Sequence, residues 1–174
     1  MKKYELTAEF IEQWGKKLFR IKALISFGSV EAGELGGYVE KEDNLAQDGD
    51  AWVCDNAWVC DNVMVYGNAR VYDNARVYDN VMVYGDARVY GDARVCGDAR
   101  VCDNADYLLI GRIGSRFSFT TFFKNKDKGI TVSCGCFLGT IAEFRAKVTD
   151  THGNNKHAKI YNLAADMAEL QILG

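Results

Sequence analysis

The sequence contains no proline, whereas a chain of 174 residues with average composition would contain roughly nine. Proline has no backbone N–H group and is largely excluded from the interior of helices and sheets. A chain without it can commit most of its N–H groups to continuous hydrogen-bond ladders. The composition therefore favours a regular, extensively hydrogen-bonded structure.

Long apolar runs are missing as well. No run approaches the roughly 18 residues that span a bilayer, and the first residues, MKKYELTAEF, lack the apolar core of a signal peptide. We therefore expect a cytoplasmic protein that has no membrane contact and whose six cysteines are reduced thiols. Four cysteines recur at one repeat position, and Cys134 and Cys136 form a CGC pattern. Neither a disulfide framework nor a metal site is predicted.

Charge is distributed unevenly along the chain. The net charge of −3 divides into −1 over residues 1–44, −6 over residues 45–106 and +4 over residues 107–174. A basic end after an acidic middle indicates either a C-terminal module that binds an anionic partner or an ordinary solvated surface.

An internal repeat of six residues dominates the middle of the chain. From Ala51, nine consecutive units share a valine at their third position, as in AWVCDN, VMVYGN and ARVYDN. Two looser units, VEKEDN from Val39 and LAQDGD from Leu45, extend the array upstream, so that eleven units end at Asn104.

Each unit reads as a short strand followed by a corner. In the unit that begins at Ala87, period-two alternation points Ala87 and Val89 to one face and Arg88 and Tyr90 to the other, and Gly-Asp turns the chain. This pattern resembles the left-handed parallel β-helix of the hexapeptide-repeat superfamily. The resemblance implies that three units form one triangular coil and that residues 18 apart stack. Eleven units would make about 3.7 coils, roughly 17 Å long at the usual strand spacing.

One side of the expected prism differs from the other two. The VMVYG units begin at residues 63 and 81, which are 18 apart, so Met64 should stack on Met82 and Tyr66 on Tyr84. Exposed methionine and tyrosine without charge are typical of a subunit interface. Because hexapeptide-repeat proteins are usually trimers, we expect a homotrimer with this stripe, Met64, Tyr66, Met82 and Tyr84, at its threefold axis. The alternative is a short exposed apolar patch.

The other two sides carry columns of arginine. Arginines beside tyrosines can bind nucleic acid, but the segment is net acidic and each arginine lies near a corner aspartate such as Asp86, Asp92 or Asp98. We therefore expect mutual neutralisation of arginine by aspartate, with the guanidinium groups stacked on tyrosine. Nucleic acid is not the expected partner.

The segment upstream of the coils resembles the leader of bacterial and prophage-borne hexapeptide-repeat proteins, which are labelled transferases or uncharacterised. The matching residues are Arg20, Ile21, Ala23, Leu24, Phe27, Gly28, Gly36, Gly37, Glu42, Asp43, Asn44, Leu45 and Gln47. Residues 18–24 alternate like a strand, and glycines suit a loop that enters the first coil. We interpret residues 1–38 as an N-terminal β cap and residues 39–105 as the β-helix.

The remaining residues, 106–174, predict an α+β module of the order β-β-β-α-α. Strands are expected at residues 106–112, 115–123 and 129–134, with Phe117, Phe119 and Phe123 on one face of the second. Thr140 and Glu143 fit a capping box that begins a helix. A second helix is expected over residues 156–170, with Ile160, Ala164, Met167 and Leu170 on its apolar stripe.

Acyltransferases that use acetyl-CoA or an acyl carrier protein are the best-known hexapeptide-repeat proteins. They take a histidine base from the coils or from a loop that interrupts them, whereas these coils are uninterrupted and contain no histidine. The only two histidines, His152 and His157, lie in the tail and are expected at helix ends or on the surface. No catalytic residue and no cofactor are predicted, although an acyltransferase with an unusual site stays the alternative.

A binding site is instead expected on the tail. If its second and third strands pair, one face would display Arg116, Ser118, Thr120, Thr131 and Ser133, a set that suits a small anionic group such as phosphate. Lys124, Lys126 and Lys128 would raise the local potential. The alternative is an ordinary solvated sheet face. The leading hypothesis is a non-catalytic homotrimeric scaffold, encoded by a phage or prophage, that binds a host protein or sequesters a nucleotide-type ligand as an anti-defence factor.

Overall fold

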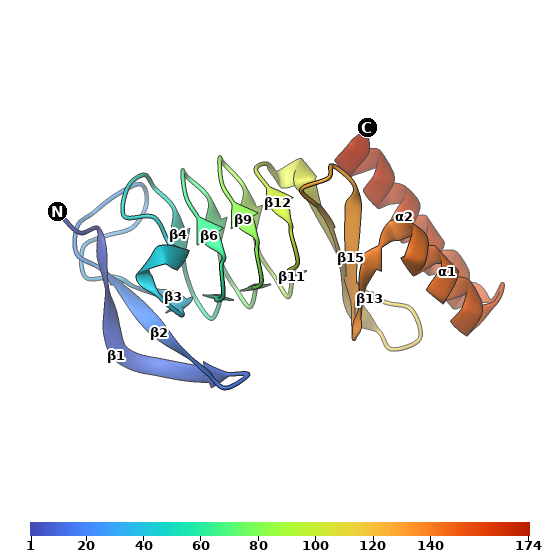
Figure 1. The fold of residues 1–174 in the computed structure, drawn as a ribbon, viewed down its shortest axis with the longest axis horizontal. Helices are drawn as coiled ribbons and strands as arrows, with labels where there is room; N and C mark the ends of the chain where they lie inside the picture. Colours follow the sequence, from blue (N-terminus) through green and yellow to red (C-terminus); the bar gives the residue numbers. More distant parts are fainter.

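The computed structural model describes residues 1–174 as an elongated, mainly β molecule. Figure 1 shows a cap at the N-terminal end, stacked coils in the middle and a sheet covered by two helices at the C-terminal end. The coils form a parallel β-solenoid of about four turns, which confirms the predicted fold class. None of the helices is both long enough and apolar enough to cross a membrane.

The coils consist of two-residue strands that stack in three parallel sheets. The strands are β4 (Trp52–Val53), β5 (Trp58–Val59), β6 (Met64–Val65), β7 (Arg70–Val71), β8 (Arg76–Val77), β9 (Met82–Val83), β10 (Arg88–Val89), β11 (Arg94–Val95) and β12 (Arg100–Val101). The sheet orders are β3-β5-β8-β11 as part of a larger sheet, β4-β7-β10 and β6-β9-β12. Met64 pairs with Met82 and Arg76 with Arg94, so the predicted stacking of residues 18 apart is confirmed.

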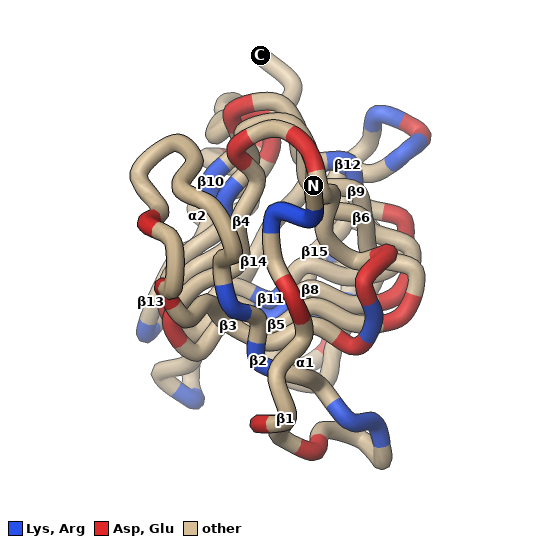
Figure 2. Tube along the Cα trace, turned by 90° about the vertical axis from the view of Figure 1, so that its left-hand side faces the viewer, with Lys and Arg blue, Asp and Glu red and all other residues tan.

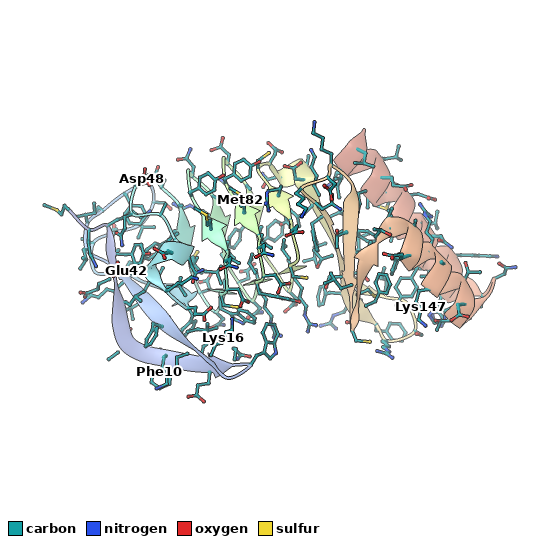
Figure 3. All side chains as sticks on the ribbon, in the orientation of Figure 1. Phe10, Lys16, Glu42, Asp48, Met82 and Lys147 are labelled. Carbon is teal, nitrogen blue, oxygen red and sulfur yellow. The ribbon has the colours of Figure 1, made fainter.

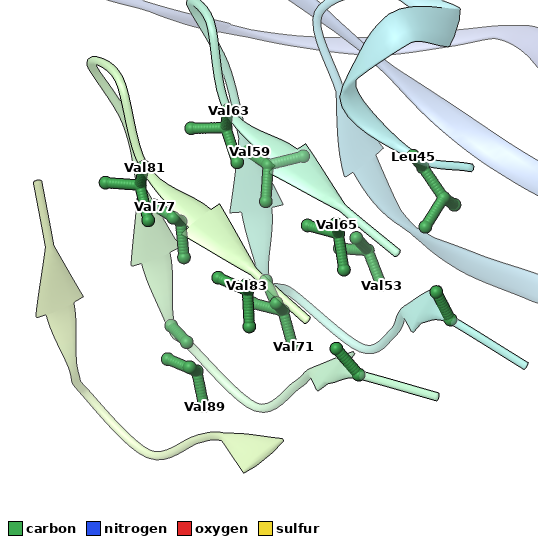
Figure 4. Close-up of a cluster of buried hydrophobic side chains, with 14 of the residues drawn as sticks. Leu45, Val53, Val59, Val63, Val65, Val71, Val77, Val81, Val83 and Val89 are labelled. Atoms are coloured by element: carbon green, nitrogen blue, oxygen red, sulfur yellow. The ribbon is translucent and has the colours of Figure 1, made fainter. Parts of the chain in front are cut away.

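Small and branched side chains fill the inside of the coils. The alanine or valine at the first position and the valine at the third position of every unit from Ala51 to Val101 are at most 1% exposed. Figure 4 shows the valines of successive coils in rows, such as Val53, Val71 and Val89, with Leu45 at one end of the cluster. Such dense packing leaves no room for a larger residue, which explains why these two positions vary so little.

The corners of the coils require a left-handed backbone. The fifth residue of every unit from residue 49 to residue 97 has a positive φ, and it is always glycine or aspartate. The two residue types serve different corners. Gly49, Gly67 and Gly85 stack on one edge, where a Cβ at Gly85 would lie 2.6 Å from the Cys102 carbonyl oxygen. At Gly97 a Cβ would meet nothing within 4 Å, and Asp79 occupies the equivalent corner one coil earlier.

The N-terminal cap is a hairpin and a loop packed on the first coil. Strands β1 (Tyr4–Gln13) and β2 (Lys16–Ala23) pair antiparallel, and β2 continues through β3 (Leu35–Val39) into the coil sheet. Trp52 lies at a repeat position whose side chain points outward from the coil. It is nevertheless fully buried, because Tyr4 and Phe27 cover it with ring centroids 6.1 and 5.3 Å away. A short 3₁₀ turn (Glu42–Asn44) then leads into the second unit.

The C-terminal sheet has four strands instead of the three predicted. A 3₁₀ turn (Asn104–Asp106) leads into β13 (Tyr107–Ile113), β14 (Ser118–Lys124), β15 (Ile130–Cys134) and β16 (Phe137–Thr140), which pair antiparallel in this order. One face closes the end of the coils, where Phe123 joins the coil core. Helices α1 (Ile141–His152) and α2 (Lys156–Leu173) cover the other face, where Phe122 lies. Both faces of the sheet are therefore covered.

Two details of the tail differ from expectation. Phe117 does not share a strand face with Phe119 and Phe123, because it lies in the turn before β14 with a φ of 47° and is 72% exposed. The predicted buried stripe of the second helix is wrong except at Ala164. Ile160, Met167 and Leu170 point outward, and the buried residues are Ala158, Tyr161, Ala164, Ala165, Ala168 and Ile172. The capping box of Thr140 and Glu143 is confirmed.

Two ion pairs hold the tail against the last coil. The Lys124 ammonium lies 2.9 Å from Asp106, and that of Lys126 lies 2.8 Å from Asp98. Asp106 is buried and also accepts hydrogen bonds from the Cys102 backbone N–H and thiol. Burial alone would raise the pKa of Asp106, but the Cys102 and Lys124 donors more than offset it, so that the pKa lies below its ordinary value.

We predict that the two corner types respond differently to the same substitution. Gly85→Asp should lower the free energy of unfolding by about 1–3 kcal/mol, because the new side chain collides with the next coil. Gly97→Asp should cost under about 1 kcal/mol, because aspartate tolerates this backbone region and the space is open. Urea unfolding of both variants checks this, and equal losses would contradict the distinction.

We also predict that Asp106→Asn destabilises the protein in a pH-dependent way. Losing the charged acceptor should cost about 1–3 kcal/mol at pH 7. Because the folded pKa of Asp106 is depressed, its contribution is complete above the unfolded pKa of about 4 and is lost as the pH falls further. The difference from wild type in urea unfolding should therefore shrink from pH 7 to pH 3. Asp127→Asn, at an exposed aspartate of the same hairpin, is the control and should show no such difference.

Candidate functional site: a cationic cavity between coils and tail

A cavity of about 180 Å³ lies where the side of the coils meets the C-terminal sheet. Arg76 of β8 and Arg94 of β11 line it from the coils, and Ser118 and Thr121 of β14 and Ser133 of β15 line it from the sheet. Asp92 is the one acidic residue in its wall. We call this the junction cavity. Two guanidinium groups and three hydroxyls in one concave surface are the donors that bind phosphate groups in proteins.

The repeat itself places the two arginines together. Arg76 and Arg94 are directly paired residues of adjacent parallel strands, and both project from the outer side of the coil. The Arg76 guanidinium also lies over the Trp58 ring, 6.0 Å from its centroid. The Arg94 backbone N–H donates to the Thr121 hydroxyl at 3.1 Å, which fixes the sheet against the coil at this point.

The predicted neutralisation of these arginines by corner aspartates is wrong. No acidic side chain lies within ion-pairing distance of any arginine in the coils. Several corner aspartates instead accept hydrogen bonds from the backbone of the next coil, as Asp73 does from Gly91 at 3.0 Å and Asp79 from Gly97 at 2.9 Å. Figure 2 accordingly shows Asp and Glu at the corners and Lys and Arg on the flat sides near β8, β10 and β11. Like charges on neighbouring strands repel each other, so an anion in the junction cavity would relieve this repulsion.

The structure brings together only part of the predicted site. Ser118 and Ser133 both line the junction cavity, but the expectation of one shared face is wrong. Strands β14 and β15 do pair, yet Thr131 lies opposite Phe123 and Ser133 opposite Thr121. Thr120 points to the other face, where it is fully buried and its hydroxyl lies 3.2 Å from the Cys134 thiol.

The lysines of the predicted site also have other partners. Lys124 and Lys126 form the two ion pairs that attach the tail, so their charge is already compensated. Lys128 is exposed in the turn between β14 and β15. Arg76, Arg94 and Thr121 were missed by sequence reasoning. The arginines could have been found, because they recur at one repeat position. The aspartates near them in the sequence, however, suggested ion pairs that the structure does not contain.

Arg116 lines a second cavity, of about 190 Å³, on the helix-covered face of the sheet. This cavity shares Ser118 and Gly135 with the junction cavity, and Phe144, His152 and Tyr161 form part of its wall. The His152 ring, at the end of α1, stacks on Tyr161 with centroids 5.8 Å apart. Burial raises the pKa of Tyr161 to about 12, so its phenol is neutral at physiological pH.

A third cavity, of about 420 Å³, lies on another side of the coils. The stacked rings of Tyr72 and Tyr90, 5.5 Å apart, line it together with Arg88 and the Asn104 and Gln171 side chains. It holds a single guanidinium group, no acidic residue, and three tyrosines, Tyr72, Tyr90 and Tyr107, in place of the serines and threonine of the junction cavity. Its formal charge of +1 equals that of the junction cavity, where Asp92 offsets one of the two arginines. The junction cavity is distinguished instead by its adjacent pair of guanidinium groups.

One group of side chains has the composition of a metal site. Potential ligand atoms of Glu40, Cys60 and Asp61 lie within 4.8 Å of one another. The Lys16 ammonium, however, pairs with both carboxylates and supplies the positive charge there. Burial and the neighbouring Asp61 raise the pKa of the Cys60 thiol, which disfavours the thiolate that a metal requires. These residues are therefore explained by an ion pair.

The fold and the period of six define the chain as a repeat β-helix, or β-solenoid, protein. Within the coils, residues 57–73, 65–78, 69–85, 75–91 and 82–97 match the family described as YdcK Beta solenoid repeat. The cap and the tail lie outside these matches. No curated protein matches the chain.

Proposed function

We propose that this protein is a non-catalytic scaffold that binds a small phosphate-bearing anion of the nucleotide type in the junction cavity. The observation that carries the proposal is that Arg76 and Arg94 are adjacent, form no ion pair, and line one cavity together with Ser118, Thr121 and Ser133. Coulombic attraction and charge-assisted hydrogen bonds to a phosphate would replace the repulsion between the two arginines. The absence of histidine from the coils argues against the acyltransferase chemistry of the hexapeptide-repeat superfamily.

The ligand is proposed to be held unaltered. The hexapeptide-repeat resemblance of the coils, and that of the leader to prophage-borne proteins, support a role in sequestering a nucleotide-type signal of the host, as an anti-defence protein of a phage or prophage would do. A protein that sequesters a ligand must bind it tightly and at several sites, and it requires no catalytic group. Assembly into a homotrimer would present the junction cavity three times.

The trimer is proposed to form through the stripe of Met64, Tyr66, Met82 and Tyr84. Met64 is 50% exposed, and the rings of Tyr66 and Tyr84 stack in parallel with centroids 5.1 Å apart. Met82 lies on the outer side of the coils, between the cap and the tail (Figure 3). These four side chains carry no charge, and Arg100, which pairs with Met82 in the same sheet, borders them. An apolar patch with a charged residue at its rim supports burial against other copies.

We expect the wild-type protein to bind inorganic phosphate weakly and nucleotide phosphates more tightly in isothermal titration calorimetry. The panel would comprise nucleoside monophosphates, cyclic nucleotides and ADP-ribose. Arg94→Gln should weaken binding by roughly 10–100-fold, because one charge-assisted hydrogen-bonding group is worth about 1.5–3 kcal/mol. Arg88→Gln, at the same repeat position on another side of the coils, should leave binding unchanged.

Two results of that titration would contradict the proposal. Equal loss in the Arg88 and Arg94 variants would show that the junction cavity is not the site. Chromatographic recovery of a chemically altered ligand, or turnover of acetyl-CoA, would show that the protein is an enzyme.

For the trimer, light scattering should give about three times the chain mass of 19.4 kDa. Met64→Lys with Met82→Lys should yield monomers, because six like charges would meet at the threefold axis. Met64→Leu with Met82→Leu should retain the trimer. A wild-type protein that is monomeric at every concentration would contradict the proposed interface.

A further inference from the structure

Helix α2 exposes its large apolar residues and buries its small ones. Ile160, Leu163, Met167 and Leu170 are 38%, 63%, 56% and 77% exposed. The face toward the sheet is built mainly from alanine, namely Ala158, Ala164, Ala165 and Ala168, together with Tyr161 and Ile172. A helix that packs only on its own domain has the opposite arrangement. Several large side chains in one exposed row mark a contact surface.

The spacing of the exposed residues specifies the shape of the partner. Residues 160, 163, 167 and 170 follow one another at intervals of three, four and three, which is the a/d pattern of helices that pack side by side. The row extends from residue 160 to residue 170 of the helix Lys156–Leu173. A second helix fits such a row, because its side chains enter the gaps between residues on the first.

Charges beside the row favour a particular orientation of that second helix. The beginning of α2 carries Lys156 and Lys159, and neither forms an ion pair within the chain. Its second half carries Asp166 and Glu169, which share one cation, Arg145 of α1, at 2.7 and 2.9 Å. The helix therefore has a basic end and an acidic half, and it is complementary to a reversed copy of itself.

We infer that α2 is a self-association surface that pairs antiparallel with α2 of a second copy of this chain. In this arrangement Ile160 packs against Leu170 of the second copy, and Leu163 packs against Met167. The basic end of each helix then lies beside the acidic half of the other. The inference is independent of the proposed ligand and of the methionine stripe, because α2 contributes no residue to the junction cavity or to the stripe and covers the face of the sheet opposite the coils (Figure 1).

The size of the surface predicts a modest affinity. Residues 160–173 span roughly 20 Å of helix, and a contact confined to one pair of helices of this length is small beside the roughly 1,200–2,000 Å² that stable interfaces bury. Pairing should therefore depend on protein concentration. If the methionine stripe also forms trimers, α2 pairs would join one trimer to another.

The test is the mass of the full-length protein by light scattering and sedimentation over a range of concentrations. Wild type should associate with increasing concentration, and Leu163→Glu with Leu170→Glu should abolish that step and halve the limiting mass. Ala142→Glu with Ala146→Glu, at exposed positions of the neighbouring helix α1, adds the same charge and should associate like wild type. Circular dichroism and thermal unfolding establish that each variant is folded.

The orientation is tested separately by Lys159→Glu. Antiparallel pairing predicts a rise of about two- to fivefold in the dissociation constant, because an attraction to the acidic half of the second helix becomes a repulsion. An unchanged or lower dissociation constant would overturn the antiparallel arrangement. A wild-type mass equal to that of the Leu163 and Leu170 double variant at every concentration would overturn self-association, and the surface would then belong to a different macromolecule.

Discussion

The ladder of backbone hydrogen bonds between successive coils is the constraint on which the rest of the structure depends. The N–H of Arg70 donates to the carbonyl of Ala87 at 2.9 Å, and that of Tyr72 donates to Val89 at 3.0 Å, with the same offset repeated around each turn. One residue more or fewer in a coil would shift every later bond out of register. The strict period of six, the absence of proline and the small interior side chains all follow from this ladder.

The same ladder forces like side chains into columns, because whatever lies at one repeat position lies about 4.8 Å from its equivalent in the next coil. For valine and tyrosine this stacking is favourable. For arginine it places like charges side by side, and several corner aspartates, such as Asp73 and Asp79, accept backbone N–H groups of the next coil instead of pairing with them. The coils thus present columns of arginines that form no ion pairs. At Arg76 and Arg94 the tail sheet adds a second wall that bears hydroxyls, which is why we propose a site there.

The parts of the fold that follow local rules could be predicted from the sequence, and the parts that depend on tertiary contacts could not. The six-residue period gives the coils, their stacking and the paired methionines, and the Thr140 capping box gives the start of α1. Alternation in β14 could not reveal that Thr120 is buried, because the prediction assumed one solvated face and the sheet is covered on both. For α2, the prediction assumed that large apolar residues face inward and therefore chose Ile160, Met167 and Leu170. In the structure the face toward the sheet consists mainly of alanines.

The outward row of α2 therefore has a structural cause as well as a consequence. Helix α2 packs on the sheet and on Phe144 through Tyr161 and several alanines, and alanine is the residue type that lets a helix approach its support closely. Close approach does not require leucine, isoleucine or methionine on the opposite face. Polar residues with high helix propensity would be compatible with solvent there. The large apolar residues there cannot be explained by the stability of this chain alone. Burial outside the chain is the interaction that accounts for them, and an α2 helix of a second copy supplies it with complementary charge.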